Sequence, residues 1–320
     1  MRNLTQHEID SLIVNLCVAE DWTNVFVPEI FSVERIYNVR FSGRVVIGKL
    51  EKEFNLPGGL KRSSCIRNAI LHNCEIGDNV LIENVSNHIS NYKIGEECFI
   101  QNVNVIAVEH SSSFGINTLV SVLNETGGRE VPIYPNLSSS LAYIIALYRH
   151  KKRAIERLWE LVASYAKEVE SSIGYIGDRV KIVNTGTLIN VHIGDYTKII
   201  NSSRLENGTI TSNREAPVFI GDGVIAKDFI ISSGCFVSDA SKIMRCFIGQ
   251  SCHVSHGFSA HDSLIFSNCN LENGEACAVF AGPFTVSVHK SSLLIAGMFS
   301  FCNAGSGSNQ SNHMYKLGPI

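Results

Sequence analysis

The side chains with the clearest potential for chemistry are histidines, and three of them stand in short polar segments. His256 and His261 are separated by four residues, and His313 is followed closely by Tyr315 and Lys316. Imidazole accepts a proton near neutral pH and also binds zinc. These histidines are therefore candidates for a general base or for metal ligands.

A further candidate is the dyad Glu109-His110, in which the carboxylate could orient the imidazole of a base. An isolated acidic-histidine pair is more often structural, so we keep this dyad in reserve. The ten cysteines show no Cys-x-x-Cys spacing. We interpret them as reduced thiols that fill a core.

The composition indicates a folded protein with a large core. Of the 320 residues, 45% are hydrophobic and only 18% are charged, and the formal net charge is -3. This balance argues against nucleic-acid binding as the main activity. The first residues lack the plan of a signal peptide, and no apolar stretch is long enough to span a membrane. We therefore expect a cytoplasmic protein that contacts neither nucleic acid nor membrane.

An aliphatic residue recurs every six positions along much of the chain. The main series contain Ile70, Ile76, Ile82, Ile94, Ile100 and Ile106, then Ile176, Ile182 and Leu188, then Ile193, Ile199 and Leu205, and later Ile220, Ile248, Val254 and Ala260. The phrase Ile-Gly-Asp or a close variant opens many of the units. A period of six fits neither an amphipathic helix nor a hairpin. It predicts coils of three short strands in which the aliphatic residue points inward and stacks on the next coil.

This pattern resembles the hexapeptide-repeat family over roughly residues 40–137 and 173–305. The resemblance implies a mainly β fold, a left-handed parallel β-helix. Members of that family usually form parallel trimers, so it also implies a homo-oligomer, with a trimer favoured.

Two segments depart from the period and predict helices. Thr5-x-x-Glu8 is a capping box that predicts a helix over residues 5–19, covering the first open coil. Residues 138–172 predict an inserted amphipathic helix, about 50 Å long if continuous. The expected organisation is an N-terminal helical cap (1–30), a first β-helix segment (31–137), the inserted helix (138–172) and a second β-helix segment (173–320). The chain is expected to continue beyond residue 320.

A basic cluster lies within the inserted helix and has two interpretations. It contains Arg149, His150, Lys151, Lys152, Arg153 and Arg157. The simpler interpretation is a solvated helix face. The alternative is a site for the phosphates of a nucleotide or coenzyme.

The end of the sequence resembles the acetyltransferase half of bacterial N-acetylglucosamine-1-phosphate uridylyltransferases. The similar segments are Ala281-Gly282-Pro283-Phe284, Val288 to Leu293, and Ser311 to Gly318. The resemblance implies that His313 is the base, that Lys290, Tyr315 and Lys316 bind a sugar-phosphate or sugar-nucleotide acceptor, and that acetyl-CoA is the acyl donor. The sequence departs from that family by lacking the arginine after Gly-Pro-Phe and by a longer gap between Lys290 and His313.

Two alternatives to an acyltransferase remain open. The pair His256-x4-His261 resembles the zinc-binding pair of γ-class carbonic anhydrases, which implies a zinc enzyme. The third histidine expected two coils upstream is missing, since Ile220 stands there. The other alternative is a scaffold or regulatory module without catalysis, attached to a nucleotidyltransferase-like protein.

Overall fold

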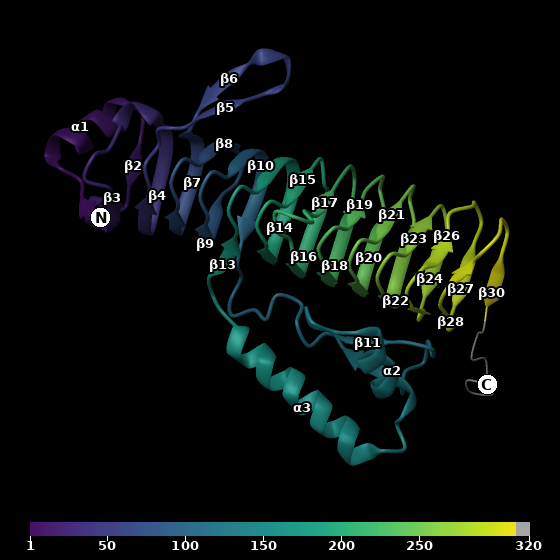
Figure 1. Cartoon of the computed structure of the whole chain (residues 1–320). Helices are drawn as coiled ribbons and strands as arrows, with labels where there is room; N and C mark the ends of the chain where they lie inside the picture. The colour runs from purple at the N-terminus through teal and green to yellow at the C-terminus, as the bar shows by residue number, and fades with distance from the viewer. Residues whose placement is uncertain (312–320) are drawn as a thin grey trace.

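A computed structural model describes residues 1–311, and short parallel strands stacked along one axis dominate it (Figure 1). The expected mainly β fold is thus confirmed. Each strand pairs in parallel with the strand one coil further on. Residue 182 pairs with 199, and 199 with 220, so these two coils take 17 and 21 residues. His313, Tyr315 and Lys316 lie outside the described residues.

The coils begin near residue 36 and continue to the end of the described chain. The strands before the insert are β4 (Ile36–Ile47), β7 (Cys65–Ile76), β8 (Leu81–Val85), β9 (Ile89–Ile94) and β10 (Phe99–Ala107). A small antiparallel hairpin, β5 (Glu53–Asn55) and β6 (Lys61–Ser63) with the 3-10 turn η3 (Pro57–Gly59), projects from the first coils. The strands after the insert are β13 (Gly174–Ile176), β14 (Lys181–Ile193), β15 (Lys198–Ile200), β16 (Arg204–Ile210), β17 (Phe219–Ile220), β18 (Ile225–Ile231), β19 (Phe236–Val237), β20 (Lys242–Ile248), β21 (His253–Ser255), β22 (Ser259–Ile265), β23 (Asn270–Glu272), β24 (Glu275–Cys277), β25 (Phe280–Ala281), β26 (Thr285–Ser287), β27 (Leu293–Ile295), β28 (Met298–Phe299), β29 (Cys302–Asn303) and β30 (Asn309–Ser311).

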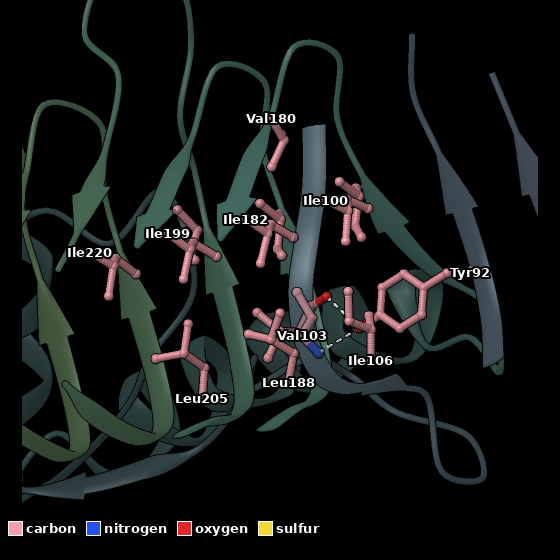
Figure 2. Packing of buried hydrophobic residues seen from close by; sticks show 14 of the residues in the cluster. Tyr92, Ile100, Val103, Ile106, Val180, Ile182, Leu188, Ile199, Leu205 and Ile220 are labelled. Atoms are coloured by element: carbon pink, nitrogen blue, oxygen red, sulfur yellow. Dashed lines mark hydrogen bonds between the residues drawn. The ribbon is translucent and has the colours of Figure 1, made fainter. Parts of the chain in front are cut away.

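The interior of the coils is a column of stacked aliphatic side chains. Ile100, Ile182, Ile199 and Ile220 form one row through consecutive strand pairs, and Figure 2 shows them beside a second row that contains Leu188. All five side chains are fully buried. Each coil therefore shields its apolar residues only because the next coil covers them.

One series of coil corners carries a ladder of asparagine side chains. Each amide donates to the side chain one coil further on, over 2.6–3.1 Å, and each asparagine has a positive φ of 51–57°. The left-handed conformation suits asparagine better than most residues. We call this series the asparagine ladder: Asn38, Asn68, Asn84, Asn102, Asn184 and Asn201, ending on Asp222.

The repeated Ile-Gly-Asp phrase has a direct structural cause. A side chain on Gly77 would place its Cβ 2.8 Å from the backbone carbon of Gly95 in the next coil, so only glycine fits. The following aspartate is used as well, because Asp178 Oδ1 accepts a 2.8 Å hydrogen bond from the amide of Glu96.

Within the main series, the six-residue period identified the interior residues with one error, at the start. Ile70 is 39% exposed, whereas its neighbours Ala69 and Leu71 are buried. Asn68 and Asn73 have left-handed backbone conformations and turn the chain at two corners of this coil. The step between the inward residues Leu71 and Ile76 is therefore five residues instead of six. The inward register is displaced by one position there.

The N-terminal region closes the first coil. It comprises β1 (Arg2–Asn3), α1 (Gln6–Val14), β2 (Val18–Ala19), η1 (Trp22–Asn24), β3 (Val25–Val27) and η2 (Val33–Arg35). The predicted capping box is confirmed, since the Thr5 amide donates to Glu8 over 2.8 Å and Thr5 Oγ1 accepts from the Glu8 amide. Leu12 on α1 is buried in the core of the coils. The helix ends at Val14 rather than at residue 19.

The insert leaves the coils after Ala107, earlier than the expected boundary at residue 137. It contains the hairpin strands β11 (Leu119–Ser121) and β12 (Glu130–Pro132) and the helices α2 (Ser139–Leu147) and α3 (Lys152–Val169). The coils continue directly across this interruption, because β10 pairs with β14. Buried residues such as Val120 and Val131 belong to the core of the insert and not to a coil.

The expected single long helix is wrong, because two helices separated by a turn occupy this part of the chain. A continuous helix would place Arg149, Lys152 and Arg153 at like-charge helical spacings. The turn also lets α2 and α3 pack their apolar faces together, where Ile145 and Val162 line a common cavity.

The insert packs along one outer wall of coils that come later in the sequence (Figure 1). The wall contributes buried apolar side chains that alternate with the interior row: Ile230, Phe247, Leu264, Phe266 and Phe280. Over residues 1–311, no helix combines the length and apolarity that crossing a membrane requires.

Candidate functional site

His256 lies at a coil corner directly after β21. It has a positive φ of 54° and precedes Gly257, whose φ is 73°. This tight turn points the imidazole outward, and its side chain is 56% exposed. The histidine is therefore accessible to a small molecule.

Carboxylates from the coils on either side flank this imidazole. Glu272 Oε2 lies 3.4 Å from Nδ1, and Asp239 Oδ2 lies 3.8 Å from Nε2. The buried Ser255 hydroxyl lies 2.9 Å from the same Nδ1 and 3.0 Å from Nε2 of His253. If Nδ1 carries its proton toward Ser255 and Glu272, Nε2 is left as a proton acceptor.

His256 and Lys290 line one hollow of about 610 Å³. Gly274, Glu275, Ser291 and Ser292 contribute to the same hollow. The structure thus brings together Lys290, predicted to bind substrate, and one histidine of the predicted zinc pair. Below we call it the His256 hollow.

His261 does not join this arrangement. It lies on β22, where its Nε2 is 3.1 Å from Ser259 Oγ, and it pairs in register with Met244 and Cys277. Within residues 1–311, no three His, Cys, Asp or Glu side chains form a group suited to a metal ion. His256 and His261 thus have separate partners in this part of the chain, and the zinc alternative stays a prediction from which we derive no chemistry.

The reserve dyad Glu109-His110 lies where the chain leaves the coils. Both residues are exposed, and the Glu109 amide donates to Asn190 Oδ1 over 2.8 Å. This hydrogen bond holds the backbone at the point where the chain leaves the coils, which gives the dyad a structural role.

The basic cluster divides into two parts. Arg149 packs over the ring of Trp159 at 5.2 Å and lies 3.7 Å from Glu130, so it belongs to the core of the insert. The remaining members of the cluster line an open hollow of about 620 Å³ where α3 begins: His150, Lys151, Lys152, Arg153 and Arg157. Both interpretations of the cluster stay predictions.

The cysteines are free, and eight of the ten are buried. Burial raises the pKa of Cys74, Cys98 and Cys246 to about 12 each, so these thiols stay protonated and unreactive at neutral pH. They act as small core residues.

Glu272 and Asp239 were not predicted from the sequence, although their spacing from His256 could have identified them. Asp239 precedes His256 by 17 residues and Glu272 follows it by 16, which is close to one coil in each direction. Applying the coil length to each candidate histidine would have placed both carboxylates beside it.

The structure defines a parallel coiled β protein with a helical insert and a histidine-centred hollow. The chain belongs to a family described as a domain of unknown function (DUF4954), whose model matches residues 1–320. It is also 25% identical over 253 residues to an uncharacterised protein of Treponema pallidum (strain Nichols). That similarity covers 74% of this chain and 34% of the relative, so the chain spans about a third of the relative's length.

Proposed function

We propose that the coils form a left-handed β-helix of hexapeptide repeats. Coil lengths of 17 or 18 residues, as between the paired residues 76 and 94 or 231 and 248, leave about six residues for each of three sides. Left-handed corner residues recur at five- or six-residue steps, as at Asn68, Asn73, Asn79 and Asn84. A crystal structure with right-handed coils would contradict this assignment.

We propose further that the protein transfers an acyl group from acetyl-CoA to a sugar-phosphate type of acceptor. The observation that carries this proposal is the shared hollow of His256 and Lys290, with Glu272 and Asp239 beside the imidazole. His256 replaces His313 as the base in this scheme, because its surroundings are those that general base catalysis requires.

His256 Nε2 removes the proton from the acceptor's amino or hydroxyl group. The freed electron pair forms a bond to the acyl carbon, the carbon–sulfur bond of the thioester breaks, and the departing thiolate takes up the proton from the imidazolium. Acetyl-CoA supplies the activated acyl group. During the step Glu272 and Ser255 hold Nδ1–H, and the two carboxylates stabilise the positive imidazolium.

Lys290 has a separate part in this scheme. Its side chain is exposed at the rim of the hollow, where an ammonium group would pair with the phosphate of the acceptor. It positions the acceptor and takes no part in the proton transfer.

A homotrimer in the cytoplasm completes the proposal. The rings of Phe219, Phe236 and His253 stack outward at 4.9 and 4.6 Å along one wall and lead to Ser255 and His256. Covering this partly exposed aromatic row with another subunit would put the His256 hollow beside an interface. The free cysteines suit a reducing compartment.

Calorimetric titration of acetyl-CoA into the full-length protein, followed by kinetics with glucosamine 1-phosphate, tests the proposal. We expect saturable binding near one site per subunit. Lys290→Ala should raise KM for the phosphorylated acceptor about tenfold and leave KM for glucosamine unchanged. The matched control is Lys242→Ala, another exposed coil lysine. No binding of acetyl-CoA would reject acyl transfer and favour a scaffold.

A further inference from the structure

A second concave site lies between the insert and the coils, away from the residues of the His256 hollow. Two neighbouring cavities of about 530 and 570 Å³ share Pro135, Asn136, Thr211 and Ser212 as lining residues. They therefore form one continuous groove, which we call the insert groove. Each half has the size of a typical small-molecule pocket.

The coil side of the insert groove is a row of polar side chains in equivalent corner positions. Hydrogen bonds between consecutive corners, such as Ser232 N to Ile248 O and Gly249 N to Ile265 O, stack these positions in register. Neighbouring parallel strands lie about 4.8 Å apart, so one polar group is presented at each such step. The row consists of Asp195, Ser212, Ser233, Gln250 and Ser267.

The insert forms the opposite side with further neutral polar groups. Asn136 is exposed and lines both cavities. Ser138, the N-cap of α2, lines the first cavity, and its Oγ accepts a 3.2 Å hydrogen bond from Leu141 N. Hydroxyl and amide groups therefore face the groove from both sides.

One end of the insert groove is aromatic. The ring of His192 stacks on Tyr175 with a centroid distance of 5.4 Å and meets the ring of Phe114 at 6.0 Å. Tyr165 on α3 lines the same end. Burial lowers the pKa of His192, against an opposing effect of Asp195, so this imidazole is neutral at neutral pH.

The charge of the insert groove separates it from the His256 hollow and from the basic hollow where α3 begins. Among its lining residues in the described part of the chain there is neither lysine nor arginine, and Asp195 is the one charged side chain. The His256 hollow, in contrast, contains Lys290. The insert groove is unsuited to phosphate or sulfate groups and suited to an uncharged ligand rich in hydroxyls.

We infer that the insert groove binds a neutral, linear oligosaccharide. Successive sugar units present hydroxyl groups at a repeat comparable to the spacing of the coils, which the row from Asp195 to Ser267 can match. The apolar C–H faces of a terminal sugar ring would pack on the aromatic end. This binding is independent of acyl transfer.

The test is titration of the full-length protein with neutral hexasaccharides (cellohexaose, maltohexaose and chitohexaose), followed by calorimetry. We expect at least one to bind saturably. The double variant Ser233→Ala/Gln250→Ala should weaken that binding about tenfold, because two polar contacts are lost. Gln250 is exposed and Ser233 half-exposed, so the fold should survive the change. The matched control is Ser86→Ala/Asn104→Ala, two exposed polar coil residues outside the groove.

Two results would overturn the inference. One is the absence of binding by all three hexasaccharides, and the other is equal binding by the groove variant and wild type. A heparin hexasaccharide serves as the anionic comparison, and preferential binding of it would also overturn the neutral class. Because the groove variant leaves His256 and Lys290 intact, it should retain acetyl-CoA turnover, which keeps this test separate from that of the proposed function.

Discussion

The hydroxyl of Tyr92 donates a 2.8 Å hydrogen bond to the carbonyl oxygen of Val191 and accepts a 3.1 Å hydrogen bond from its amide. Tyr92 is fully buried inside the coils, and the insert separates the two residues in the sequence. Val191 pairs with Gly208 on one side, and the tyrosine takes the place of a strand partner on the other side, where β10 has ended and the chain has left the coils. Gly174 leaves room for the ring, since a Cβ there would lie 2.5 Å from Tyr92 Cζ.

Tyr92→Phe should lower the free energy of unfolding by about 1–3 kcal/mol, because the buried amide and carbonyl of Val191 lose their partner. Chemical denaturation followed by circular dichroism measures this loss. Tyr37→Phe is a suitable control, because Tyr37 is 45% exposed. Equal stability of Tyr92→Phe and wild type would show that the bridge is dispensable.

Two substitutions in the asparagine ladder distinguish the contribution of backbone conformation to stability from that of the side-chain hydrogen bonds. Asn102 has a φ of 53°, accepts from Asn84 and donates to Asn184. Asn102→Ala loses both the bonds and the preference for this conformation, and should cost about 1–3 kcal/mol. Asn102→Gly keeps the conformation accessible and should cost less. Thermal unfolding of both variants measures the difference, and a glycine variant less stable than the alanine variant would contradict it.

The N-terminal cap should become less stable in acid. Hydrogen bonding to Arg2, with smaller contributions from Thr5, lowers the pKa of Glu8 to about 2 from an ordinary value of 4.5. Because the folded state favours the ionised carboxylate, its contribution is present above about pH 4.5 and is lost as the pH falls toward 2.

Glu8→Gln should therefore remove about 1 kcal/mol of stability at pH 7 and very little at pH 2. Hydrogen exchange of the α1 amides across this pH range measures the effect. Asp10→Asn on the same helix is the control, and a loss that does not depend on pH would contradict the assignment.

The attachment of the insert depends on aromatic packing against the outer wall of the coils. Phe266 is 3% exposed, and its ring centroid lies 5.5 Å from Phe247 and 5.2 Å from Phe280. Phe266→Ala should cost about 3–5 kcal/mol and loosen the insert before the coils. Hydrogen exchange should then increase in α2 and α3. Phe258→Ala, whose side chain lies inside the coils, is the control. The same hydrogen-exchange pattern in both variants would contradict the claim that the wall residues hold the insert.

The sequence predicted the features that repeat and missed those that depend on distant contacts. The stacked rows through Ile182 and Ile199 follow from the period, and the capping box of Thr5 and Glu8 is a local motif. The end of the helix at Leu147 was not predicted, because it depends on how α2 and α3 pack against each other. The carboxylates beside His256 come from other coils, and the register that brings them there is not a local pattern.

The most direct test of the account is the rate of thioester cleavage of acetyl-CoA by the full-length protein with an amino-sugar phosphate as acceptor. The comparison is between His256→Asn and His261→Asn, two histidines on neighbouring segments of the same coils. If His256 is the base, its variant should lose about 100-fold or more in kcat, and the His261 variant should match wild type. Equal rates for the His256 variant and wild type would contradict the proposed catalytic function.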